Sequence, residues 1–117
     1  MAVKKEKQKG CMVVHVNSEK LDSFIAPELK AELVTINAEG NKNIVIDLSE
    51  ARYCDSSGLS AILVGNRLCN SSGGKMVLTG LKDPVKKLIL ISQLDSILNT
   101  ALTIEEGISS LSAEEEV

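Results

Sequence analysis

Two adjacent hydroxyl side chains stand in the segment Asp55-Ser56-Ser57-Gly58, directly before an amphipathic stretch. A helix that starts there places both hydroxyls beside its unpaired backbone N–H groups, where the helix dipole also favours negative charge. A phosphate group on either serine would be stabilised at that position. The same hydroxyls are also good helix caps, and capping is the commoner use of such a pattern. Taken alone, the four residues leave both roles open.

Three carboxylates, Asp47, Glu50 and Asp55, bracket the end of the apolar run that precedes these serines. Carboxylates grouped at the end of a strand are able to bind Mg²⁺. No lysine or threonine partner for a phosphoryl reaction occurs at matching strand ends, however. We therefore expect Asp47 and Asp55 to accept hydrogen bonds from turn amides, Glu50 to face solvent, and the protein to hold neither a metal nor a cofactor.

Most arrangements of catalytic residues are missing from the sequence. His15 is the single histidine, and it lies within an apolar stretch, where a strand side chain is the simpler interpretation. Ser56 lacks the glycine pattern of a nucleophile elbow, and the segment 73–75 is only a fragment of a phosphate-binding loop. We expect a protein that is not an enzyme. The alternative, a hydrolase that uses Ser56, would need Asp22, Asp55 or His15 as a general base.

The composition describes one small domain with an aliphatic core. The chain has 117 residues, of which 44% are hydrophobic, 25% are charged and only 2% are aromatic, with a net charge of −3. Few aromatic residues and an acidic body argue against nucleic-acid binding, and no apolar run is long enough to span a membrane. The three cysteines are widely spaced, which favours a reducing, cytoplasmic setting. We expect a flexible basic segment over residues 1–10, one domain over residues 11–111 and an acidic tail over residues 112–117.

Strand and helix patterns alternate along the chain. The Asp22-Ser23 pair offers N-cap chemistry for the first helix, which stops at residues 39–41, and Asp55 precedes the second. Such alternation predicts a single α/β domain with a four- or five-stranded, mixed and mostly parallel sheet and about four helices. The predicted strands are 11–16, 20–21, 43–48, 75–79 and 97–102, and the last two helices are 84–91 and 104–111.

The wider context of the serine pair resembles a known family. The segment Asp-Ser-Ser-Gly-Leu-Ser-Ala-Ile-Leu (55–63), preceded by Ile-Val-Ile-Asp-Leu-Ser (44–49), is similar to the STAS family, and in particular to its anti-sigma-factor antagonists. Leu21-Asp22 and the segments 73–78 and 84–88 extend the resemblance. It covers residues 13–108. One departure is Glu19, which stands where family members often have glycine and which excludes a glycine-only backbone conformation at that turn.

The resemblance implies a site and partners. Ser56 matches the family's phosphoacceptor, with Ser57 as the second choice, and Gly58 would let a partner approach the helix start closely. The expected partner is an anti-sigma factor with serine kinase activity, which the unphosphorylated chain binds so that a sigma factor is released for transcription. A separate serine phosphatase would reset the switch. The alternative is a constitutive docking subunit of a transporter or stress-signalling assembly. The expected partner-binding residues are Asp22, Ser23, Asp55, Gly58, Leu59 and Ser60.

Overall fold

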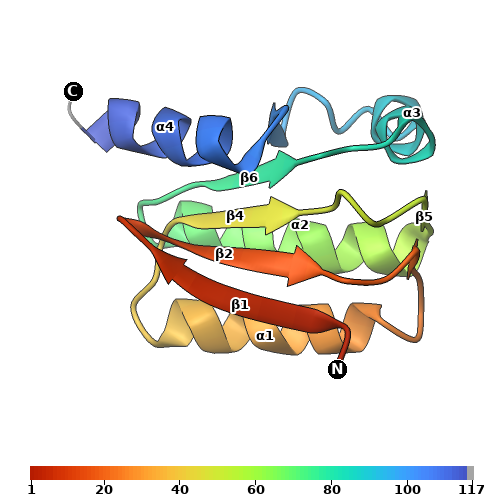
Figure 1. Ribbon diagram of the computed structural model, residues 1–117, viewed down its shortest axis with the longest axis horizontal. Coiled ribbons are helices and arrows are strands. Elements are labelled where there is room, and N and C mark those ends of the chain that lie inside the picture. Colours follow the sequence, from red (N-terminus) through yellow and green to blue (C-terminus); the bar gives the residue numbers. More distant parts are fainter. Residues whose placement is uncertain (116–117) are drawn as a thin grey trace.

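The computed structural model describes residues 1–115, which form one layered α/β domain (Figure 1). Five strands make a sheet in the order β1-β2-β4-β6-β7, and β3 pairs with β5 in a separate two-stranded sheet. Only the β1–β2 pair is antiparallel; the other pairs are parallel. The predicted fold class is therefore confirmed. The elements are β1 (Val3–Gln8), β2 (Cys11–Val16), β3 (Lys20–Leu21), α1 (Ala26–Ala38), β4 (Ile44–Asp47), β5 (Tyr53–Cys54), α2 (Ser56–Ser71), β6 (Met76–Thr79), α3 (Asp83–Ile91), β7 (Asn99–Ala101) and α4 (Ile104–Glu115).

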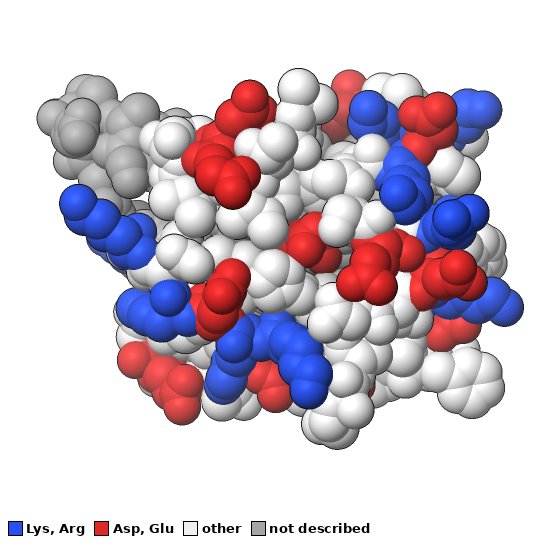
Figure 2. All heavy atoms as spheres, in the orientation of Figure 1, with Lys and Arg blue, Asp and Glu red and all other residues white. Residues whose placement is uncertain are grey.

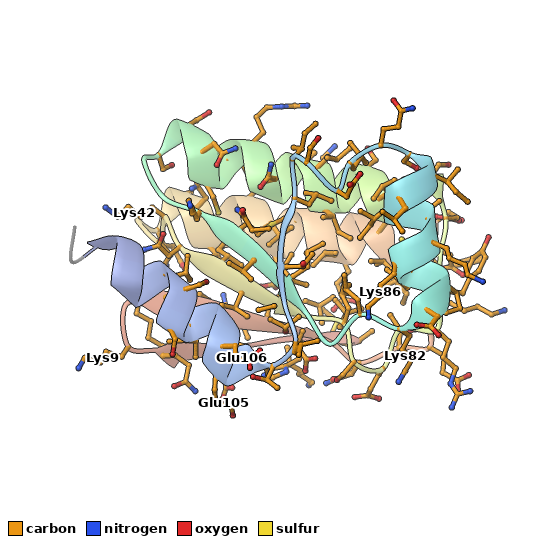
Figure 3. The ribbon with its side chains drawn as sticks, turned by 90° about the horizontal axis from the view of Figure 1, so that it is seen from above. Lys9, Lys42, Lys82, Lys86, Glu105 and Glu106 are labelled. Atoms are coloured by element: carbon orange, nitrogen blue, oxygen red, sulfur yellow. The ribbon has the colours of Figure 1, made fainter. Side chains whose placement is uncertain are left out.

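Helices cover both faces of the sheet, so its central strands are apolar on both sides. Figure 3 shows α1 and α2 on one side, α4 on the other, and α3 at one end of the molecule. The buried apolar residues form two clusters, one on each face of the sheet, and the larger lies under α1 and α2. Successive residues of each central strand point alternately to the two clusters. The two rows are Val14, Ile46 and Leu78 in the larger cluster, and Val13, Val45 and Val77 in the cluster under α4.

The N-terminal segment forms a strand, and the expectation of a flexible segment over residues 1–10 is wrong. Strand β1 pairs with β2 along its whole length, from Val3 opposite Val16 to Gln8 opposite Cys11. The Lys5 ammonium lies 3.5 Å from the Glu32 carboxylate on α1, which ties the strand to the helix layer. The sequence hides this strand because nearly all of its side chains are charged or polar. Lysines on an edge strand also discourage pairing with another chain.

Several element boundaries and one strand pairing differ from the predicted ones. Helix α1 starts at Ala26, and Asp22 caps the turn before it: its Oδ1 accepts a hydrogen bond from the Phe24 N–H at 3.0 Å. Strand β3 pairs with the unpredicted strand β5 and not with β2. Strand β7 is shorter than the predicted 97–102. Helix α4 continues to Glu115, so the expected acidic tail over 112–117 is helical as far as it is described, and residues 116–117 lie outside the described part.

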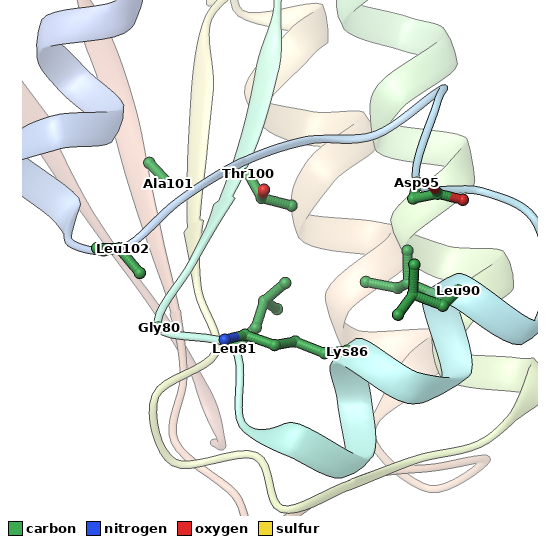
Figure 4. A pocket seen from close by; sticks show the side chains of 9 residues that line it. Gly80, Leu81, Lys86, Leu90, Asp95, Thr100, Ala101 and Leu102 are labelled. Carbon is green, nitrogen blue, oxygen red and sulfur yellow. The ribbon is translucent and has the colours of Figure 1, made fainter.

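A cavity of about 390 Å³ opens between α3 and the segment around β7 (Figure 4). Figure 4 shows the Lys86 side chain extending along the cavity toward Gly80, while Asp95 lies at its opposite end. The side chains of Leu81 and Ile89 form part of the apolar wall of this cavity. The serine pair of α2 does not line this cavity.

Candidate functional site

Ser56 is the first residue of α2, at the N-terminal end of the helix. Asp55 is the N-cap residue, and its Oδ1 accepts a hydrogen bond from the Gly58 N–H at 3.0 Å. The cap role is therefore filled by Asp55, and the Ser56 hydroxyl is not needed for it. Ser56 is exposed, whereas Ser57 is half-buried. Accessibility favours Ser56 over Ser57 as the residue that a modifying enzyme would reach.

The β3–β5 pair brings Asp22 to the start of α2. The two short strands run parallel with Leu21 opposite Cys54, so Asp22 and Asp55 each follow a strand at the same end of this pair. The Asp55 N–H donates a hydrogen bond to the Leu21 carbonyl oxygen at 3.3 Å, which fixes the two segments together. Asp22 and Asp55 are half-buried, while Ser23 and Ser60 are exposed. The structure thus assembles one surface from two segments more than thirty residues apart in sequence.

Gly58 and Leu59 do not belong to that surface. A Cβ on Gly58 would lie 2.3 Å from the Leu21 carbonyl oxygen and 2.9 Å from the Cys54 sulfur, so the missing side chain makes room for β3 of the same chain. Leu59 is only 8% exposed and packs in the larger apolar cluster. Both residues are buried in the free chain, and the expectation that a partner approaches Gly58 and contacts Leu59 stays a prediction. Both residues hold the start of α2 against the neighbouring strands.

The Glu19 turn is held by backbone hydrogen bonds. The Glu19 carbonyl oxygen accepts the N–H groups of Arg52 and Tyr53, at 2.8 and 3.1 Å. Among the described non-glycine residues only Gln93 has a positive φ, so Glu19 needs no conformation that favours glycine. A shallow hollow of about 370 Å³ lies beside this turn, and its lining includes Glu19, Asp22 and Phe24. Two acidic residues and Lys20 therefore line the hollow, and Glu19 Oε1 also lies 3.8 Å from Arg52 Nε.

The other candidate carboxylates have structural partners. Asp47 Oδ1 accepts the Ser49 N–H at 3.0 Å, and its Oδ2 lies 2.7 Å from His15 Nδ1. Glu50 is exposed, as predicted. Among the side chains that the structure describes, no group of three or more histidine, cysteine or acidic residues is placed to hold a metal ion. Asp47 and Asp55 thus accept hydrogen bonds from turn amides, which confirms that prediction.

His15 lies between two carboxylates, with Nε2 3.1 Å from Glu6 Oε1. Burial alone would lower the pKa of His15, but the hydrogen bonds to Asp47 and Glu6 and their negative charges outweigh it and raise that pKa. Burial would raise the pKa of Asp47, but the hydrogen bonds from His15 and Ser49 lower it overall. His15 is engaged in the sheet, and the described residues show no hydrogen bond from it to Ser56.

The cysteines are packing residues. Cys11, Cys54 and Cys69 are all buried free thiols. Burial, with the nearby charge of Asp55, raises the pKa of Cys54 to about 11, so its thiol is protonated at neutral pH. Although Cys54 lies two residues before Ser56, it offers no reactive thiolate to the site. Cys11 and Cys69 pack among apolar core residues as small hydrophobic side chains.

The face of the molecule drawn in Figure 2 carries charges of both signs. Figure 2 shows acidic and basic groups interspersed over the face that carries β1 and β2. In Figure 3 the labelled lysines are divided between the two ends of the molecule, with Lys9 and Lys42 at one end and Lys82 and Lys86 at the other. No helix within the described residues is long and apolar enough to cross a membrane.

The sequence model of the STAS domain family matches residues 2–107, which include every strand of the main sheet. The chain belongs to the STAS domain family. The match begins earlier than the resemblance over 13–108 suggested, and it includes β1, the strand that our sequence interpretation missed. A STAS identity is thus confirmed over nearly the whole described chain.

Relatives of this STAS domain include anti-sigma factor antagonists. The anti-sigma F factor antagonist of Paenibacillus polymyxa is 28% identical over 99 residues, which are 84% of each chain. A serine-to-glutamate variant of RsbS from Moorella thermoacetica superposes with a TM-score of 0.83 and 26% identity, covering 100% of both chains. SpoIIAA in its unphosphorylated form superposes with a TM-score of 0.81 and 23% identity, covering 96% of this chain and 97% of that chain. Phosphorylated SpoIIAA from Bacillus has a TM-score of 0.73 and 22% identity, covering 93% and 98%.

Two features of the site escaped the sequence interpretation. The first is the role of Gly58 in making room for β3, which depends on the unpredicted pairing of β3 with β5. No short sequence motif predicts a two-residue strand. The exposure of Phe24 and Tyr53 beside the site is the second feature. A signal for it was present, because these are the single phenylalanine and the single tyrosine of a chain with an aliphatic core.

Proposed function

We propose that this STAS domain is a phosphorylation-controlled binding switch of the cytoplasm. In its unphosphorylated form it binds an anti-sigma factor with serine kinase activity and so frees a sigma factor for transcription. The observation that carries the proposal is the exposed Ser56 hydroxyl at the start of α2, beside Asp22, in a STAS-family chain. Its relatives support the proposal, since one is an anti-sigma F factor antagonist and SpoIIAA occurs in a phosphorylated form.

The contact surface consists of the exposed residues around Ser56. Ser23 and Ser60 are exposed, and the half-buried Asp22 and Asp55 contribute carboxylates at its centre. These residues come from the β3–α1 turn and from the start of α2, which β3 and β5 hold together. The partner supplies the ATP from which the phosphate comes. A serine phosphatase removes that phosphate and restores binding.

Phosphorylation acts on the contact and leaves the fold intact. A phosphate on Ser56 adds about −1.5 to −2 charge at pH 7, next to the carboxylates of Asp22 and Asp55. The free N–H groups of the first helical turn and the helix dipole stabilise this charge within the protein. A partner that buries the same surface would have to desolvate the charge. A coupling of about 1–3 kcal/mol weakens binding by about 5–150-fold.

The test is calorimetry. The serine-kinase anti-sigma factor from the same organism is titrated separately with wild type and with three variants of this chain. We expect wild type and Ser56→Ala to bind, Ser56→Asp to bind at least about tenfold more weakly, and Ser57→Ala to match wild type. With ATP present, mass spectrometry of the peptides should find phosphate on wild type and Ser57→Ala but not on Ser56→Ala. Equal affinity of Ser56→Asp and wild type would refute the charge switch and favour constitutive docking.

A further inference from the structure

Both large aromatic side chains of the protein lie on its surface. The chain has one phenylalanine, one tyrosine and no tryptophan. Phe24 is 88% exposed and Tyr53 is 51% exposed, while the core is built from aliphatic residues. Aromatic side chains bury more apolar area than most others, so folding normally places them inside. The core gains little from Phe24, and Tyr53 leaves about half of its surface available to a partner.

The two rings lie on the two segments that build the serine site. Tyr53 is the first residue of β5, which leads directly into α2, and it stands opposite Lys20 of β3. Phe24 lies in the turn after β3, where its N–H donates to Asp22 Oδ1. Phe24 also lines the shallow hollow that Glu19 and Asp22 border. The rings therefore belong to the same surface as Ser56.

We propose that Phe24 and Tyr53 are the apolar anchors of the anti-sigma factor contact, and that the partner presents an apolar recess next to a basic side chain. This inference rests on the proposed function. Tyrosine and other large aromatic residues dominate the binding energy of protein interfaces, where they fill pockets on the partner. Glu19 already lies 3.8 Å from Arg52 Nε, so the half-buried carboxylate of Asp22 is the group that complements a basic side chain of the partner. A cation is also attracted to the face of an aromatic ring.

The anchors also explain how one phosphate affects binding. Rings that dock into a recess exclude water from the neighbouring contact, and electrostatic interactions strengthen where water is excluded. A phosphate on Ser56 then lies at the edge of a dry contact. Other exposed apolar residues, such as Leu90, Ile97 and Leu102, are aliphatic, and they lie on α3 and around β7, not on the two segments that build the serine site. Position on the segments next to Ser56, together with the contact of the Phe24 N–H with Asp22, therefore singles out the two rings.

The experiment uses the full chain and the recombinant serine-kinase anti-sigma factor of the same organism. Calorimetry compares wild type with Phe24→Ala, Tyr53→Ala and the control Leu102→Ala, which removes an apolar side chain that is 73% exposed and follows β7, outside the two segments that build the serine site. We expect each aromatic substitution to weaken binding at least about tenfold and Leu102→Ala to change it less than about twofold. Because the rings are exposed, circular dichroism melting curves of all three variants should match wild type.

A spectroscopic measurement supplies an independent readout. Fluorotyrosine and fluorophenylalanine label one site each in this chain, Tyr53 and Phe24. Adding unlabelled partner should shift or broaden both ¹⁹F resonances. If wild type binds while both alanine variants bind within about twofold of it and neither resonance responds, the inference is overturned and the proposed function stands. If wild type itself does not bind the partner, the proposed function fails and this inference fails with it.

Discussion

Gly58→Ala is the substitution whose effect follows most directly from the geometry of the site. The new Cβ would lie 2.3 Å from the Leu21 carbonyl oxygen and 2.7 Å from Leu21 Cγ. The nearest of these atoms belongs to the backbone, so relief requires α2 to move away from β3. Overpacking of this kind costs about 1–3 kcal/mol, and the higher helix propensity of alanine returns at most about 1 kcal/mol. We expect a net loss of about 1–2 kcal/mol in the free energy of unfolding.

Gly65→Ala is the matched control, because Gly65 lies in the same helix. Its Cβ would also be close to other atoms, 2.8 Å from Leu33 Cδ1 and 2.9 Å from Met76 Sδ, but these are the ends of flexible side chains that can move. Thermal and urea unfolding followed by circular dichroism measure both variants. A loss of 1–2 kcal/mol corresponds to about 4–8 °C in the melting temperature of a chain of this size, and Gly65→Ala should lose less. If the melting temperature of Gly58→Ala equals or exceeds that of Gly65→Ala, the close packing of α2 against β3 is refuted.

Three further substitutions or treatments have defined outcomes. Asp55→Ala removes the helix cap and should lower the free energy of unfolding by about 0.5–2 kcal/mol in urea titrations, whereas Asp55→Asn should lose little. The pKa of His15 is raised in the folded state. Protonated His15 therefore contributes its full stabilisation below the pKa of histidine in the unfolded chain, and this stabilisation is lost as the pH rises through the pKa of His15 in the folded protein. Wild type should therefore lose more stability than His15→Gln between about pH 6 and about pH 8.5, and equal losses would contradict the His15–Asp47 contact. Because burial raises the pKa of both Cys54 and Cys69 to about 11, native protein at about pH 8 should react with a thiol reagent far more slowly than urea-unfolded protein, and equal rates would argue against their burial.

Local sequence patterns predicted most of the elements because their signals are contained within a few residues. The run Ile44-Val45-Ile46 is apolar without interruption, which is typical of a strand covered on both faces, and it forms β4. Asp55 precedes a helical pattern and is the N-cap of α2. Pro84 lies in the first turn of α3, where its missing N–H costs little. The position of Ser56 at a helix start could be derived from the sequence alone for the same reason.

Elements whose stability comes from distant partners could not be derived in this way. The charged strand β1 has no apolar alternation, and it is a strand because β2 offers hydrogen bonds along its length. Strand β5 has only two residues and is defined by its pairing with β3. Asp22 carries an N-cap signal, yet the turn that it caps lies before the helix.

The sequence by itself determined the α/β order of the elements, the aliphatic core and the serine at the start of a helix. Only the tertiary structure decided which residues share the surface with that serine. The contact of β3 with β5 and α2 buries Gly58 and Leu59 and leaves Phe24 and Tyr53 exposed beside Ser56. The physical reason is that helix caps and apolar periods depend on near neighbours in sequence, whereas burial depends on which segments pack together in space.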